Sequence, residues 1–209
     1  MKAETKKALA EIHEKYKENG YNHLHLELQM YSIDKIEDLV SGYVPKIEYK
    51  GKIYRLWCRC GIKKAGVRFE DLIRPFQTPC PHQWWMSEST RNNIVDKLEK
   101  AKVLEQQYKC FEELYDKLVK MKITSGDLFR YDLSLRISQC LNILPKDYVY
   151  LHAGAADGAE VLHNKGLIKL PAEWKHRVRK NVFDKLFPNM EAIDIENLLC
   201  IHKKDFEKL

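Results

Sequence analysis

The spacing of apolar residues changes along this chain. Before about residue 87 it is mixed, and after that residue it is mainly helical. Residues 3–18 carry apolar side chains three or four positions apart with charges between them, which predicts a helix ended by Asn19-Gly20. Residues 23–28 alternate between polar side chains and leucines, as in a half-buried strand. A short helix ending near Val40 is expected to follow.

The segment between residues 44 and 61 is predicted to form a β-hairpin. Its aliphatic and aromatic β-prone residues lie on both sides of Lys50-Gly51, which supplies the turn. Residues 67–74 are expected to form a short helix that stops before Pro75, because proline disfavours the helical conformation of the residue before it.

After residue 87 the pattern is mainly helical, interrupted by a β-prone stretch, YVYLHAG, that begins at Tyr148. Helices are expected over these segments: 88–121, as one helix or two; a stretch capped by Ser125; 157–163; 171–186; and 190–207. The expected fold class is therefore α+β and predominantly helical. Residues 1–87 would form a small mixed part containing the hairpin, and residues 88–209 a mainly helical part.

Composition is that of a folded soluble protein, with 44% hydrophobic and 32% charged residues in 209. No apolar run approaches the roughly 20 residues that span a bilayer, so no membrane partner is expected. The N-terminal stretch lacks the continuous apolar core of a secretory signal, and we expect a cytoplasmic location. In a reducing compartment the six cysteines would bind metal or be buried rather than form disulfides.

The net charge of +6 is unevenly distributed. Residues 42–87 contain nine Lys and Arg residues but only three Asp and Glu residues, whereas the rest of the chain is close to balanced. An anionic partner is therefore expected to contact residues 42–87 first.

Two pairs of metal-ligand residues lie within the same segment: Cys58 and Cys60 in WCRCG, and Cys80 and His82 in PCPHQ. In a strand, residues i and i+2 share a face, so each pair can offer two ligands to one side. Three thiolates and one imidazole suit a tetrahedral structural zinc site, and zinc is the expected cofactor. The outline is similar to zinc ribbons, although those families place two residues between the ligands of each pair. The alternative is that these cysteines are ordinary buried core residues, as expected for Cys110, Cys140 and Cys200.

Basic and aromatic residues alternate in the hairpin segment, a combination that favours single-stranded or flexible nucleic acid because cations follow the phosphates and rings stack on bases. The predicted nucleic-acid contacts are Lys50, Lys52, Arg55, Arg59, Lys63, Lys64, Arg68, Trp84 and Trp85. In an extended segment one of the two adjacent tryptophans faces outward, where it would contact either a base or a protein partner.

Three other features of the sequence are weaker candidates for a metal site or a nucleic-acid surface. His23, His25 and Glu27 share one strand face but span about 13 Å, too far to bind one ion together. The basic stretch at residues 175–180 is expected to be a solvated helix face. Gly154 and Gly158 invite comparison with the helix-hairpin-helix turn of DNA-binding proteins, but a strand-to-helix turn capped by Asp157 is favoured.

The expected function is therefore a binding protein with a structural zinc site and a basic surface for nucleic acid. One alternative is an enzyme whose acid and base groups come from His152, Asp147 and Asp157, although the chain contains none of the common catalytic motifs. Another is a protein-interaction scaffold built on the helices of residues 88–121.

Overall fold

The computed structural model describes residues 2–18, 36–41, 47–49, 52–56, 73–75, 86–123 and 126–209. The chain divides into two compact units. The terminal unit comprises residues 1–22 and 145–209, and the central unit comprises residues 23–144. This division differs from the boundary expected after residue 87, because the first helix packs with the last one.

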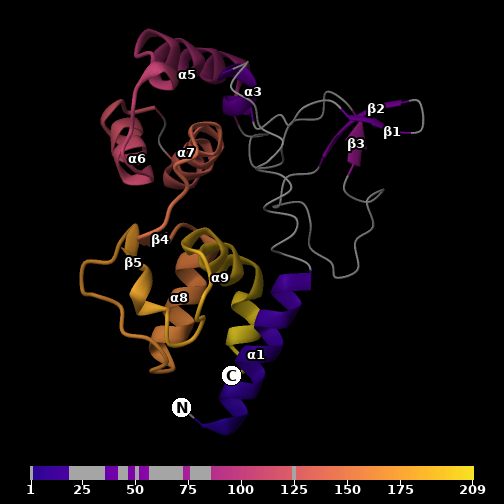
Figure 1. Ribbon diagram of the computed structural model, residues 1–209, viewed down its shortest axis with the longest axis vertical. Helices are drawn as coiled ribbons and strands as arrows, with labels where there is room; N and C mark the ends of the chain where they lie inside the picture. The colour runs from indigo at the N-terminus through magenta and orange to yellow at the C-terminus, as the bar shows by residue number, and fades with distance from the viewer. Residues whose placement is uncertain are drawn as a thin grey trace. The chain divides into compact units, whose positions relative to one another are not determined.

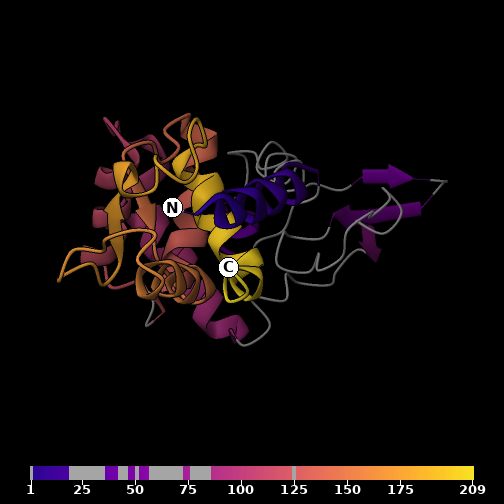
Figure 2. The same cartoon turned by 90° about the horizontal axis from the view of Figure 1, so that it is seen from below.

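The terminal unit combines helices with a two-stranded ribbon. Its elements are α1 (Ala3–Tyr16), β4 (Tyr148–Tyr150), α8 (Gly154–Asn164), β5 (Arg177–Arg179), the 3-10 helix η5 (Lys180–Val182) and α9 (Ala192–Phe206). Figures 1 and 2 both show α1 alongside α9, although the two helices come from opposite ends of the chain. Apolar residues from α1, α8, α9 and both strands form one core.

Helices α8 and α9 approach closely because α8 has glycine at the contact. A Cβ atom added to Gly158 would lie 2.4 Å from the carbonyl oxygen of Leu199, and one added to Gly154 would lie 2.8 Å from the Sγ atom of Cys200. The two glycines are four residues apart and therefore share one face of α8. The glycine spacing noted in the sequence thus serves helix packing.

The central unit contains the predicted hairpin and a group of helices. Its elements are α3 (Ile36–Ser41), β1 (Ile47–Tyr49), β2 (Lys52–Leu56), β3 (Ile73–Pro75), α5 (Glu88–Lys100), the 3-10 helix η4 (Val103–Glu105), α6 (Phe111–Lys120) and α7 (Asp127–Leu141). Strands β1, β2 and β3 form an antiparallel sheet in that order, with Tyr49 opposite Lys52. A second core joins the helices, and Arg136 of α7 donates a hydrogen bond of 3.0 Å to the carbonyl oxygen of Leu39 in α3.

The predominantly helical α+β class and the N-terminal hairpin are confirmed. The stretch 88–121 forms two helices rather than one, because Lys102 adopts a left-handed conformation with φ of 49° and ends the first. Helix α8 begins at Gly154, so Asp157 lies inside its first turn and is not the cap. None of the helices among the described residues combines the length and apolar character needed to cross a membrane.

Two predicted helices are wrong where the structure describes them. Within 67–74, residues 73 and 74 belong to strand β3, which pairs with β2. Within 171–186, residues 177–179 form strand β5 and residues 180–182 a 3-10 turn. In both cases pairing with a distant strand determines the backbone conformation, which local helical spacing cannot anticipate.

Candidate nucleic-acid interface

The ribbon of β4 and β5 has two chemically different faces. The strands pair antiparallel, with Tyr148 opposite Arg179, Val149 opposite Val178 and Tyr150 opposite Arg177. The central pair of valines is buried in the core of the terminal unit. Because side chains alternate along a strand, the two tyrosines and the two arginines share the opposite face.

The tyrosines and arginines of this face contact one another directly. The guanidinium carbon of Arg179 lies 4.4 Å from the ring centroid of Tyr148, and that of Arg177 lies 5.2 Å from the same centroid. Nη1 of Arg177 also donates a hydrogen bond of 3.2 Å to the Tyr150 hydroxyl. Stacking on an aromatic ring fixes the plane of a guanidinium group and so orients its N–H groups.

The residues of the tyrosine–arginine face differ in exposure, and the segment that carries the arginines is positively charged. Tyr150 is buried, Tyr148 and Arg177 are half-buried, and Arg179 is exposed together with Lys175 and His176. Residues 175–180 contain four Lys and Arg residues and no Asp or Glu residue. Lys180 is bound by Asp184 at 2.9 Å, whereas Lys175 and Arg179 are exposed and are the cations best placed for an external anion.

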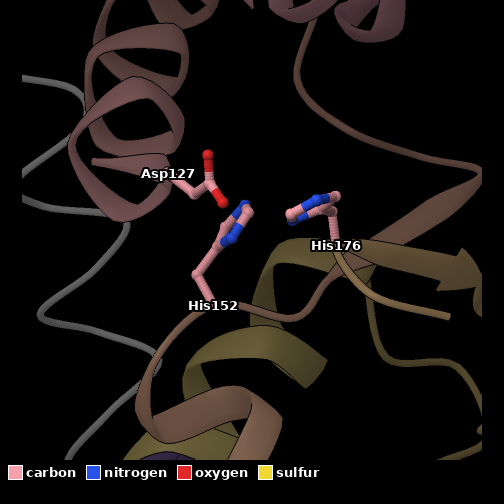
Figure 3. A group of neighbouring side chains, drawn as sticks. All are labelled: Asp127, His152 and His176. Atoms are coloured by element: carbon pink, nitrogen blue, oxygen red, sulfur yellow. The ribbon is translucent and has the colours of Figure 1, made fainter. Parts of the chain in front are cut away.

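Two histidine side chains, His152 and His176, lie near each other beside the ribbon (Figure 3). The ring centroid of His152 lies 6.1 Å from that of Tyr150 and 6.3 Å from that of His176. His152 is 4% exposed, whereas His176 is exposed. The main chain continues the ribbon here, since the amide of Leu151 donates to the carbonyl oxygen of His176 at 2.8 Å. Asp127, also labelled in Figure 3, belongs to the central unit, where it begins α7 and forms an ion pair with Arg130.

Ala153, which follows His152, has an unusual backbone conformation. Its φ of 43° and ψ of −117° lie in a region that residues with a Cβ atom rarely adopt. Strain of this kind persists only where surrounding contacts impose it, and it is often found near functional sites. At Ala153 it turns the chain sharply from the ribbon into α8 and so fixes the position of His152.

The acid and base residues considered for an enzyme occupy different surroundings. The carboxylate of Asp157 binds the ammonium group of Lys203 on α9 at 2.6 Å, and this hydrogen bond raises the pKa of Lys203. Asp147 is exposed, and its carbonyl oxygen accepts a hydrogen bond from the amide of Lys180. The ring of His152 lies beside the rings of Tyr150 and His176.

Most residues predicted for metal or nucleic-acid binding lie outside the described residues. These are Cys58, Cys60, Cys80, His82, Lys50, Arg59, Lys63, Lys64, Arg68, Trp84 and Trp85, together with His23, His25 and Glu27. Lys52 and Arg55 lie on β2, where the backbone register pairs Arg55 with Arg74 of β3.

The tyrosine–arginine face was missed in the sequence because its basic half was assigned to a helix. The signal that identifies it is the matching alternation of Tyr-Val-Tyr at 148–150 and Arg-Val-Arg at 177–179. Each triplet places its single apolar residue between two residues of the same kind, as a strand with one buried face requires.

Comparison of the chain with protein families, with curated proteins and with solved structures gave no match. The assignment of a function therefore depends on the chemistry of the chain itself.

Proposed function

We propose that this protein binds nucleic acid, and that the tyrosine–arginine face of the β4–β5 ribbon is one of its contact surfaces. The observation that carries the proposal is the stacking of Arg177 and Arg179 on Tyr148. Guanidinium groups bind phosphates with paired hydrogen bonds. The basic segment, residues 42–87, with predicted contacts from Lys50 to Trp85, is the second proposed surface.

A phosphate-contacting surface has a measurable consequence. Each cation that neutralises a phosphate releases counterions, so the affinity falls linearly with salt concentration on logarithmic axes. Binding of a fluorescent single-stranded oligonucleotide to the full chain should therefore weaken steeply as KCl increases. Wild-type protein that fails to bind at low salt, or binds independently of salt, would contradict the proposed function.

The contribution of the ribbon is tested by removing two exposed cations. The variant Lys175→Gln/Arg179→Gln should reduce the slope of log affinity against log salt by about 1.4 for a single strand. Its matched control, Lys7→Gln/Lys204→Gln, removes the same charge from exposed positions on α1 and α9 and should leave the slope unchanged. If the two variants lose slope equally, the ribbon is not a specific contact surface and only the net charge matters.

A structural zinc ion bound by Cys58, Cys60, Cys80 and His82 is also part of the proposal, supported by the ligand types and their paired spacing. Elemental mass spectrometry of protein purified without chelator should give about one zinc per chain. The variant Cys58→Ser/Cys80→Ser should lose it. If the purified wild-type protein contains no metal, the proposed zinc site is wrong. The test of the ribbon does not depend on that result.

A further inference from the structure

A pocket of about 520 Å³ lies in the terminal unit, between the last turn of α1 and the first turn of α9. Its size is in the range of small-molecule sites. The residues that matter for its chemistry are His13, Tyr16 and Lys17 of α1, Met190 and Glu191 just before α9, and Asp194 within it. The pocket shares no residue with the tyrosine–arginine face.

Asp194 is the most deeply buried charged group of this pocket, with an exposure of 1%. The Tyr16 hydroxyl donates a hydrogen bond of 2.9 Å to Oδ1 of Asp194, and Nδ2 of Asn197 donates one of 3.2 Å to the Tyr16 oxygen. Asp194 also lies in the first turn of α9, where the helix dipole favours a negative charge. These contacts hold a carboxylate in a fixed position at the pocket wall.

The direction of these hydrogen bonds makes the lining rich in acceptors. Tyr16 directs its one hydroxyl proton to Asp194, and its oxygen accepts the hydrogen bond from Asn197, so Tyr16 offers no hydroxyl donor to a ligand. The carboxylates of Asp194 and Glu191 are acceptors. Lys17 is the one ammonium group among the described residues that line the pocket, and it binds Glu14 at 3.0 Å. Burial, and then the charge of Lys17, lower the pKa of His13, which favours its neutral form.

We infer that this pocket binds a small organic cation carrying a primary amine, with the ammonium group bound by Asp194 and Glu191 and the organic body against Met190 and Tyr16. Each N–H donor of an ammonium group can pair with an acceptor of the lining. Charge-assisted hydrogen bonds to a carboxylate that is already buried and oriented are stronger than those formed at an open surface.

Calorimetric titration of the full chain with benzylamine, benzyl alcohol and benzoate tests this inference. These probes have similar size and differ in charge and donor number. Benzylamine should bind with saturation below about 5 mM, benzyl alcohol should bind at least about tenfold more weakly, and benzoate should not bind. Equal binding of the three probes, or no binding of benzylamine, would overturn the inference.

Two variants locate the binding. Asp194→Asn should weaken benzylamine binding by at least about tenfold, with folding checked by thermal unfolding because the residue is buried. Glu191→Gln should weaken it by about threefold, and this change is exposed and removes no cap hydrogen bond, so it decides the outcome if Asp194→Asn does not fold. The control Glu160→Gln, at an exposed position of α8, should leave binding unchanged. Undiminished binding in folded Glu191→Gln and Asp194→Asn proteins would reject this pocket.

Discussion

Two buried polar side chains, Tyr16 in the terminal unit and Arg136 in the central unit, form hydrogen bonds with different kinds of partner. In the terminal unit, Tyr16 of α1 bonds to Asp194 and Asn197 of α9 through side chains only, across 178 and 181 positions of sequence. In the central unit, Arg136 bonds to the main-chain oxygen of Leu39. A hydrogen bond between two side chains requires particular residues at both positions. A hydrogen bond to a main-chain oxygen requires a particular residue only at the donor position. The terminal network also lines a pocket, so its residues combine a structural role with a chemical one.

Helix packing in the terminal unit is the feature most sensitive to substitution. Gly158→Ala should lower the free energy of unfolding by about 3 kcal/mol, because the new Cβ atom would meet main-chain atoms of Leu199 that cannot rotate away. Urea unfolding measures the change. The control Gly126→Ala is at the N-cap of α7 in the central unit and its Cβ atom would meet nothing within 4 Å, so it should cost no more than about 1 kcal/mol. Equal effects would show that the contact between α8 and α9 is looser than described.

Removing one hydroxyl group tests how much the buried hydrogen bond between Tyr16 and Asp194 stabilises the terminal unit. Tyr16→Phe should cost about 2 kcal/mol, because Asp194 loses a buried hydrogen-bond donor. Tyr108→Phe removes a half-buried hydroxyl that makes a 3.3 Å bond to Gln106 in the central unit, and it should cost less than about 0.5 kcal/mol. A cost of Tyr16→Phe no larger than that of Tyr108→Phe would show that the buried hydrogen bond to Asp194 contributes no more than a half-buried one.

The smallest expected effect is a pH dependence at His13. Burial and the charge of Lys17 lower its pKa below the ordinary 6.5, so the unfolded chain binds a proton more readily than the folded one. The resulting stabilisation is complete above pH 6.5 and is lost as the pH falls through 6.5 and the lower folded pKa. Thermal unfolding of the wild type and of His13→Gln between pH 7.5 and 5 should therefore give a difference in Tm that changes with pH. A difference in Tm that is constant over this range would contradict the lowered pKa of His13.

Local patterns predicted the elements that depend on a residue's own neighbours in sequence. The spacing of Leu9, Ile12 and Tyr16 correctly predicted α1, because all three side chains are buried on one face of a helix. Lys50-Gly51 between β-prone residues correctly indicated the hairpin of β1 and β2. The same reasoning failed at residues 177–179, where apolar and basic residues fit either a helix or a strand.

The candidate interface could be predicted only in part. Arg177 and Arg179 were recognised as part of a basic stretch, but their partner Tyr148 lies about thirty residues earlier, and sequence spacing carries no information on that pairing. The pocket beside Asp194 was not predicted, because its walls come from the two ends of the chain.

By itself, the sequence determined the helical character, the hairpin, the location of positive charge and the set of candidate zinc ligands. These features follow from residue type and from spacing over a few positions, which local sterics and solvation control. The tertiary structure decided that Arg-Val-Arg is a strand beside Tyr-Val-Tyr, that Gly158 admits a neighbouring helix, and that Tyr16 orients Asp194. Each of these depends on contacts between residues far apart in the chain, which form only when the whole terminal unit buries its apolar surface.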